Sequence, residues 1–594
     1  MTKLFSTEFV LKYLLILHLN LFLYRDPNIG NTAFISDVMW PKFDLENQQY
    51  LILEPNATVG ENFAAESYAF WHEYIPSLLE EETDEEDETC TLDAPIPIWE
   101  SIPPPESKIF QIESSDMVLG LINGTLVHVS DAIGPSEINV IRGIPYAKPP
   151  IGTLRFSPPS PVDPWDGTIS GTDPAPSCPY AAALVDDVDW SEDCLTLDIA
   201  AVNGAEANSL PVIVFIMGVN FQDGGQIPSA EMLASGTNSV VVTFRYRVGA
   251  FGFLSTGDSS ASGNYGLLDT IAVLKWVNNY IGSLGGNPDQ VTLMGYGTGG
   301  SIVNIMLLSK QSDGLFHRAI SLNEITFSRV LHTSRQIKTS PLTSTVQLGE
   351  NVGCSYEDNE QLLKCLRNES VTASDILRAS IASMTPILFF PVVDNNVLID
   401  SIENLSRNAS NFKVVDHLIG VTEDPGALRL MRFNEPEMMA MDSSCLTEDV
   451  WRKHLNSIVN GHLTDHGPIT RTLAAEYLET LPSESDENPC PLLRRAVDFL
   501  NDLFFVIPTL NQANTHSKTS GANVFLYKFT QIPKYRGPYS NNSPPWIGSS
   551  FGDDIQYLFG LPYSATSSPG CYGAEDRKTS LVFKKILRDF ITSG

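Results

Sequence analysis

The hexapeptide at residues 295–300, Gly-Tyr-Gly-Thr-Gly-Gly, follows an apolar run of strand type and precedes a helical pattern that begins at Ser301. A strand-turn-helix segment of this kind has two chemical meanings. As G-x-G-x-x-G, it would hold the pyrophosphate of a dinucleotide on backbone amides at a helix N-terminus. As the elbow of a serine hydrolase, it would present a nucleophile at the centre of G-x-S-x-G. The central residue is Gly297, which has no side chain that could attack a carbonyl carbon.

The segments around this hexapeptide predict an α/β fold. Apolar runs of strand type, such as residues 210–217 and 240–244, alternate with helical patterns, such as residues 266–280. This alternation predicts a large, mostly parallel central sheet that is covered by helices on both faces. In such sheets, functional sites lie at the C-terminal ends of the strands, which is where the hexapeptide falls.

Composition limits the classes of partner. The chain has 594 residues, of which 43% are hydrophobic, so it can bury a large core. It carries 71 acidic against 37 basic residues, for a net charge of −34. Because nucleic acid binding depends on clustered Lys and Arg, we expect no nucleic acid partner, whereas basic or calcium-bridged partners fit the charge. No cysteine pattern indicates zinc, and we expect no metal and no cofactor.

Several features predict secretion. Residues 9–24 are apolar apart from a few polar positions, and we interpret residues 1–24 as a signal peptide. No second apolar stretch near 20 residues follows, so we expect no membrane anchor in this sequence. Possible glycosylation sites of the form Asn-x-Ser/Thr lie at Asn56, Asn123, Asn368, Asn404, Asn408 and Asn541.

The eight cysteines also fit an extracellular protein. Cys178 and Cys194 are 16 residues apart and Cys354 and Cys365 are 11 apart, separations that suit local disulfide loops. Pairing among the other four cannot be read from the sequence; these are Cys90, Cys445, Cys490 and Cys571.

The N-terminal part differs from the rest. Residues 25–116 include an acidic run at 79–88 and a proline cluster at 102–106, and we expect this segment to be acidic, solvated and disordered. A binding arm for a basic partner is the alternative. The globular pattern begins at about Met117 and continues to residue 594.

An ordered series of motifs resembles the carboxylesterase and cholinesterase family. It comprises Val-Ile-Arg-Gly-Ile-Pro-Tyr-Ala at 140–147, Ser-Glu-Asp-Cys-Leu at 191–195, and the segments 245–253, 263–269 and 314–320. The resemblance covers residues 117–594 and implies an α/β-hydrolase fold, with a domain that is cut short at its C-terminus. It favours the hydrolase elbow, because a dinucleotide turn would follow the first strand of its fold, whereas residues 117–294 precede this one.

Carried over residue by residue, the resemblance implies that the catalytic groups are lost. The nucleophile position is Gly297, the base position is Phe551 and the acid position is Pro425. The oxyanion glycines are replaced by Val219 and Asn220, whose side chains hinder a close backbone approach. We therefore expect no enzyme activity from this site.

Substitute groups are few. Glu423 or Asp424 could replace the acid, but no histidine follows His516, so a base would require a different site. The string Gly-Ser-Ser-Phe-Gly at 548–552 also fits G-x-S-x-G. We interpret it as a loop, because no apolar strand precedes it and we expect no helix after it.

A secreted hydrolase fold without its triad resembles the cholinesterase-like adhesion molecules, which include neuroligins, gliotactins, neurotactins and glutactins. The resemblance implies extracellular or cell-surface recognition at synapses or septate junctions, a neurexin-like or other cell-surface partner, and homodimers through C-terminal helices. It also implies the disulfides Cys178–Cys194 and Cys354–Cys365. The alternatives are an active carboxylesterase or cholinesterase with an unrecognised nucleophile, and a pseudoenzyme that binds a small ligand. Neuroligin or gliotactin type is our preferred interpretation, with a plasma-membrane location if a C-terminal span exists.

Overall fold

The fold is taken from a computed structural model, which describes residues 50–53, 58–60 and most of 105–593. Between 105 and 593, the stretches that it leaves out are chiefly 130–133, 185–187, 226–227, 324–339, 382–386, 429–450, 456–476, 478–490, 537–545 and 564–571. The predicted signal peptide, Asn56, Asn541 and the cysteines Cys90, Cys445, Cys490 and Cys571 lie outside the described residues.

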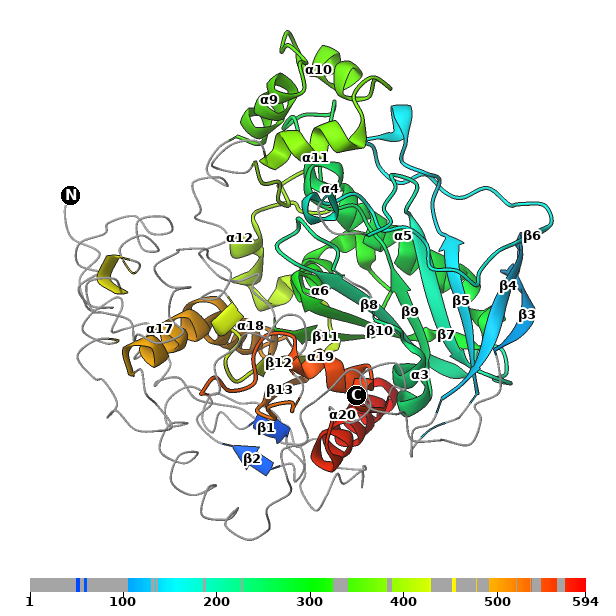
Figure 1. Ribbon diagram of the computed structural model, residues 1–594, viewed down its shortest axis with the longest axis vertical. Helices are drawn as coiled ribbons and strands as arrows, with labels where there is room; N and C mark the ends of the chain where they lie inside the picture. The colour runs from blue at the N-terminus through cyan, green and yellow to red at the C-terminus, as the bar shows by residue number, and fades with distance from the viewer. Residues whose placement is uncertain are drawn as a thin grey trace, which may run out of the picture.

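A single mixed sheet of 13 strands runs through the molecule (Figure 1). The strand order is β2-β1-β13-β12-β11-β10-β8-β9-β7-β5-β4-β3, with β6 paired to β4. The pairs from β1 through β13, β12, β11, β10 and β8 to β9 are parallel, whereas β9, β7, β5, β4 and β3 pair antiparallel. The strands are β1 Tyr50–Leu53, β2 Thr58–Gly60, β3 Glu106–Glu113, β4 Val118–His128, β5 Glu137–Pro145, β6 Thr168–Ile169, β7 Thr196–Val202, β8 Leu210–Gly218, β9 Val240–Phe244, β10 Gly286–Gly297, β11 Arg318–Leu322, β12 Asp416–Thr422 and β13 Val524–Phe529.

Helices cover both faces of this sheet, as the alternation of strand and helix patterns predicts (Figure 1). Among the described helices, none combines the length and the apolar character that a bilayer crossing requires. The α-helices are α3 Glu231–Thr237, α4 Gly249–Phe253, α5 Tyr265–Tyr280, α6 Thr298–Leu308, α9 Pro341–Asn351, α10 Asn359–Leu366, α11 Ala373–Ile381, α12 Ile402–Ser406, α17 Pro491–Asn501, α18 Ile507–His516, α19 Asp553–Leu558 and α20 Ala574–Ser593. Short 3-10 or π segments are η2 Gly152–Leu154, η3 Ala181–Leu184, η4 Ile281–Leu284, η5 Lys310–Ser312, η6 Ala409–Asn411, η7 Asp502–Val506 and η8 Leu561–Tyr563.

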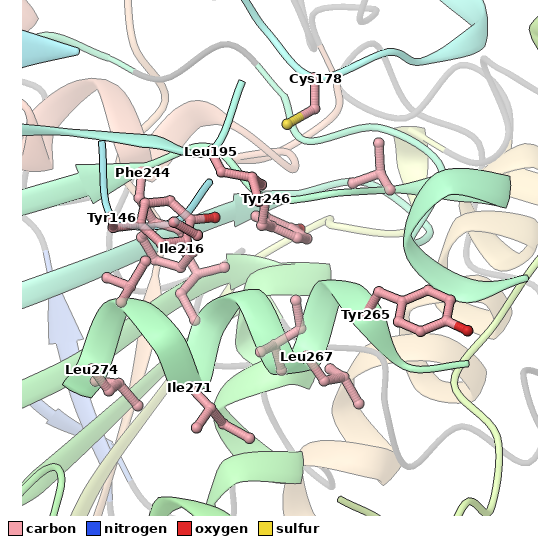
Figure 2. Packing of buried hydrophobic residues seen from close by; sticks show 14 of the residues in the cluster. Tyr146, Cys178, Leu195, Ile216, Phe244, Tyr246, Tyr265, Leu267, Ile271 and Leu274 are labelled. Atoms are coloured by element: carbon pink, nitrogen blue, oxygen red, sulfur yellow. The ribbon is translucent and has the colours of Figure 1, made fainter. Parts of the chain in front are cut away.

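Two hydrophobic cores lie on opposite faces of the sheet. Successive side chains of a strand point to opposite faces, so residues 212, 214 and 216 of β8 enter one core and residues 213, 215 and 217 enter the other. The first core packs against α5 and α6; Figure 2 shows part of it, with Ile216 and Phe244 from the strands and Leu267 and Leu274 from α5. The second packs against α3 and α20. Burial on both faces explains why the central strands are continuous apolar runs.

Covalent and ionic links hold the connections around this sheet. The disulfides Cys178–Cys194 and Cys354–Cys365 are both present, which confirms the predicted pairings. The segment after β9 is joined to α5 through a buried ion pair, in which the Arg247 Nε and Nη2 atoms lie 2.8 and 2.7 Å from the Asp269 carboxylate oxygens. Both side chains are almost fully buried, so either one alone would leave an unpaired charge in the core.

The expected boundary at Met117 is wrong. β3 pairs antiparallel with β4, so the folded domain includes residues from at least Glu106 onward. Short strands β1 and β2 also lie in the segment that was expected to be disordered, and β1 pairs parallel with β13 through Leu51 and Tyr527. Short strands of this kind take their stability from the sheet edge that they join rather than from a strong pattern of their own.

The C-terminal ends of the central strands meet at one edge of the sheet. Gly297, at the end of β10, is in register with Gly218 at the end of β8. On the other side, Tyr296 is in register with Leu322 of β11, which is in register with Gly420 of β12. This edge therefore brings together the positions that the sequence singled out.

Candidate functional site

The elbow at the end of β10 keeps the geometry of a hydrolase elbow. Gly297 has φ 57° and ψ −119°, and α6 starts at the next residue. A Cβ atom at Gly295 would lie 2.1 Å from the Gly299 carbonyl oxygen, and one at Gly299 would lie 2.0 Å from the Ile216 carbonyl oxygen. The two flanking glycines are therefore needed for the close approach of β8, β10 and α6, whatever residue stands at the centre.

The ring of Phe551 lies against Gly297. A Cβ atom at Gly297 would come within 2.9 Å of the Phe551 Cζ atom and 2.8 Å of the Gly218 carbonyl oxygen. Phe551 is 6% exposed and packs edge-on against Tyr296, with ring centroids 5.0 Å apart. Phe505 contacts the ring from another side, at 6.3 Å between centroids. The position expected to hold a base thus holds an apolar ring that fills the space beside the nucleophile position.

The loop after β8 is closed on itself. The Val219 N–H donates to the Asp223 carbonyl oxygen at 2.8 Å, and the Val219 carbonyl accepts from Gln222 and Asp223. The Gln222 amide also donates to the Phe389 carbonyl oxygen at 2.5 Å. Asn220 is exposed and has φ 52°, in the left-handed region. At Val219, the backbone donor that an oxyanion would need is therefore already used.

The position expected to hold the catalytic acid holds a proline. Pro425 is buried and offers no carboxylate. Its neighbour Asp424 is fully buried, accepts two hydrogen bonds from Arg494, and accepts others from Asn501 and the Gly548 N–H. Burial raises the pKa of Asp424, but the Arg494 guanidinium, with the hydrogen bonds from Gly548 and Asn501, outweighs burial, so the pKa is lowered. The Lys528 ammonium lies 3.2 Å from a carboxylate oxygen of Glu423. Both substitute acids that the sequence suggested are thus engaged in ion pairs.

A buried polar network that the sequence did not reveal joins the ends of three strands, β10, β11 and β12, to α19. The Tyr296 hydroxyl donates to the Asp554 Oδ1 atom at 2.9 Å. The Asn323 amide, just after β11, donates to the Asp554 Oδ2 atom at 3.1 Å and accepts from the Thr422 N–H at 2.9 Å. The Gly552 N–H donates to the Tyr296 hydroxyl at 2.5 Å. The residues that form this network are up to 258 positions apart, so no local pattern could indicate it.

Burial is the main influence on the pKa of Asp554. It raises the pKa of that carboxyl to about 7, helped by the neighbouring Asp553 and opposed by the hydrogen bond from Tyr296. Asp554 therefore takes up a proton near neutral pH although it is held among polar groups.

A second missed cluster contains the serine–histidine contact that hydrolase chemistry would need. The Ser321 Oγ atom lies 3.0 Å from His417 Nε2, and His417 Nδ1 lies 3.1 Å from His516 Nδ1. All three side chains are fully buried. Burial lowers the pKa of His516 to about 4 and holds that of His417 well below its usual range, so both rings are neutral at neutral pH. For hydrolysis at this cluster, a substrate would have to reach the Ser321 hydroxyl group, which is enclosed by protein.

Two further sequence candidates do not form sites. Ser550, the central residue of Gly-Ser-Ser-Phe-Gly, is fully buried, and its N–H donates to Asp553 at 2.7 Å. The expectation that no helix follows is wrong, because α19 begins at Asp553, but Ser550 lacks the positive φ of the elbow. Within the described part of the chain, no group of three or more His, Cys, Asp or Glu side chains is arranged to hold a metal ion.

Comparisons of the sequence with known proteins point to one family. Residues 108–594 match the family model described as Carboxylesterase family. The chain is 31% identical over 496 residues to bile salt-activated lipase of Rattus norvegicus, covering 80% of this chain and 76% of the lipase. It is 31% identical over 462 residues to acylcarnitine hydrolase of Mus musculus, covering 74% of this chain and 76% of the hydrolase. It is also 31% identical over 522 residues to neuroligin-3 of Mus musculus, covering 80% of this chain and 61% of neuroligin-3. Equal identity to hydrolases and to a neuroligin means that overall similarity does not separate the two groups.

The Gly297→Ser variant tests the steric exclusion at the elbow. We expect it to lower the free energy of unfolding by about 2–4 kcal/mol, because a Cβ atom meets Phe551 and the backbone is strained for a side chain. In a double-mutant cycle with Phe551→Ala, the combined loss should be smaller than the sum by about 1–2 kcal/mol. Phe590→Ala, in α20, is the matched control, and its loss of stability should add to that of Gly297→Ser. Additivity with Phe551→Ala, measured by urea denaturation, would contradict the contact.

The Asp554→Asn variant tests the buried carboxyl. Because the folded pKa of about 7 lies above the ordinary value of 3.8, the native state holds the proton over that interval. The resulting stability is fully present below about pH 4 and is lost as the pH rises through about 7, by roughly 4 kcal/mol at most. The free energy of unfolding of Asp554→Asn, relative to that of the wild type, should therefore rise as the pH is raised from about 4.5 to about 8.

The control for this pH dependence is Asp163→Asn, which removes an exposed carboxylate that pairs with Lys148. The histidine pair titrates in both the wild type and the variants, so its effect cancels in the difference. An equal stability difference between Asp554→Asn and wild type at both pH values would show that Asp554 does not hold a proton in the folded state.

Proposed function

The chain belongs to the carboxylesterase family, and we propose that it uses this scaffold for extracellular recognition between cells rather than for ester hydrolysis. The observation that carries the proposal is the contact between Gly297 and Phe551. The family pattern expects the nucleophile at Gly297 and the base at Phe551, and the proposal is supported because a Cβ atom at Gly297 would meet the Phe551 ring.

Changes at the other positions support the same proposal. The Val219 N–H is used by the loop itself, and Asp424 and Glu423 are held by basic side chains. Transition-state stabilisation in acyl transfer requires a nucleophile, a base and free oxyanion donors in one place. Changes that affect all of these parts favour a role in which the fold is kept for its surface.

The partner is proposed from the family resemblance. Similarity to neuroligin-3 and to neuroligin-2 of Mus musculus supports a role at the cell surface. We propose contact at synapses or septate junctions with a neurexin-like or other cell-surface protein, and homodimers of the kind that the resemblance implies. The strongly acidic composition, with a net charge of −34, suits a partner that is basic or is bridged by calcium.

A second candidate function is hydrolysis through another nucleophile, and the Ser321–His417 contact is the observation that favours it. Its enclosure and the low pKa of the two histidines argue against rapid turnover. A pseudoenzyme that binds a small ligand is a third alternative, which thermal-shift screening of ester and acid ligands would reveal.

Turnover of p-nitrophenyl acetate separates hydrolysis from recognition. We expect the purified chain to be no faster than buffer with denatured protein, and Ser321→Ala to give the same rate. Bile salt-activated lipase prepared in the same way is the positive control. Turnover that disappears in Ser321→Ala would move the function to the second candidate, and turnover retained in that variant would point to a further nucleophile.

A cell-aggregation assay tests recognition directly. Cells that display residues 25–594, which include β1 and β2, through an unrelated membrane anchor should aggregate with cells that display a neurexin ectodomain or the same chain. If calcium bridges the contact, chelation should disperse the aggregates, because the acidic surface would again repel its partner. Cells that display the Gly297→Ala/Phe551→Ala double variant are the control. They should aggregate equally if the variant reaches the cell surface, because neither residue lies on the exterior of the protein. Failure of both pairings, with display confirmed by antibody, would contradict this choice of partners.

A further inference from the structure

We propose that Asn368 and Asn408 carry N-linked glycans, whereas Asn404 and Asn123, which lie in the same Asn-x-Ser/Thr motif, do not. The proposal rests on the extracellular location of the proposed function. It separates four sites that the sequence motif treats alike, through the surroundings of each amide and of the hydroxyl residue two positions later.

The chemistry requires a free amide nitrogen. An oligosaccharide is supplied by a polyisoprenyl pyrophosphate donor, and a bond forms between the Asn Nδ2 atom and the anomeric carbon of the sugar. The bond from that carbon to the pyrophosphate oxygen breaks, the pyrophosphate leaves with the electron pair, and Nδ2 loses one proton. In the folded protein, Nδ2 must then point to a space that accommodates a bulky, hydrated group.

Asn368 meets both requirements. It follows α10 and precedes α11, and it is exposed together with Glu369 and Ser370. Its Oδ1 atom accepts from the Ser370 N–H at 2.9 Å. This turn holds the oxygen side of the amide against the backbone, and Nδ2 makes no hydrogen bond to any residue that the structure describes.

Asn408 has the same local geometry between α12 and η6. It is exposed, and its Oδ1 atom accepts from the Ser410 N–H at 3.1 Å. The Ser410 hydroxyl lies 2.9 Å from the same oxygen, so the hydroxyl of the motif is also beside the amide. The Nδ2 atom again has no hydrogen-bond partner among the described residues. Because both turns form from three consecutive residues, they need no tertiary contact.

Asn404 differs although it is exposed and only four residues away. It lies inside α12, and its Nδ2 atom donates to the two carboxylate oxygens of Asp400 at 3.1 and 3.3 Å. The Ser406 hydroxyl of its motif is 7% exposed and donates to the Glu403 carbonyl oxygen at 3.1 Å. The amide nitrogen and the hydroxyl are thus both engaged within the helix and its preceding turn.

Asn123 is held within the sheet. It lies in β4, is half-buried, and pairs with Ile109 of β3. Its Oδ1 atom accepts from the Gly171 N–H at 2.8 Å, and a Cβ atom at Gly171 would lie 2.3 Å from the Asn123 carbonyl oxygen. The chain around residue 171 therefore runs so close to Asn123 that a glycan there would displace it.

The test uses the full chain expressed in secretory eukaryotic cells, once with its own N-terminus and once with an added cleavable signal peptide. The secreted protein is treated with peptide-N-glycosidase F in ¹⁸O-water, and the marked residues are identified by peptide mass spectrometry. Asn368→Gln and Asn408→Gln should each remove one glycan on a gel, whereas Asn404→Gln, the matched control, should leave the mobility unchanged.

With the added signal peptide, we expect Asn368 and Asn408 to be mostly occupied and Asn404 and Asn123 to be unoccupied. Occupancy of Asn404 or Asn123 equal to that of Asn368 would overturn the proposal. So would bare Asn368 and Asn408 in protein whose Cys354–Cys365 disulfide is formed, because that bond shows passage through an oxidising compartment. Glycans that appear only with the added signal peptide would support the two sites while overturning the extracellular location.

Discussion

The contact between the Gly297 backbone and the Phe551 ring determines what the C-terminal edge of the sheet can do. The turn from β10 into α6 demands φ 57° at its centre, a conformation that glycine adopts without steric cost. Because Gly297 has no side chain, the Phe551 ring lies close to the position that a Cβ atom would take. The ring also packs on Tyr296, whose hydroxyl group is a member of the buried network with Asp554. A side chain introduced at Gly297 therefore also affects the packing of Phe551 and Tyr296.

The constraints of the fold are separate from the constraints of catalysis. Gly295 and Gly299 persist because a Cβ atom at either position would collide with backbone atoms of α6 or β8. The central residue of the turn faces the site instead, where a Cβ atom would meet the Phe551 ring and the Gly218 carbonyl oxygen. This separation explains how the elbow is recognisable in a chain that has a glycine at its centre. Equal identity to a hydrolase and to a neuroligin fits a scaffold that hosts more than one function.

The sequence predicts the parts of this fold that depend on local periodicity. The runs at 210–217, 240–244 and 266–280 correspond to β8, β9 and α5 almost to the residue, because strands buried on both faces are continuous apolar runs. The N-terminal boundary was missed, because β1 pairs with the distant β13, β2 pairs only with β1, and β3 joins the sheet through β4. At the site, the positions of Gly297, Phe551, Pro425 and Val219 follow from motif order. The contacts with Asp554 and among Ser321, His417 and His516 do not, because they join segments that only the folded chain brings together.

The central claim is that this scaffold presents no reactive serine, and covalent labelling tests it more directly than turnover does. The purified chain would be incubated with an excess of a fluorophosphonate and its intact mass measured, with bile salt-activated lipase treated in parallel. We expect complete labelling of the lipase and an unchanged mass for this chain. A stoichiometric adduct on one serine, located by peptide mapping, would contradict it.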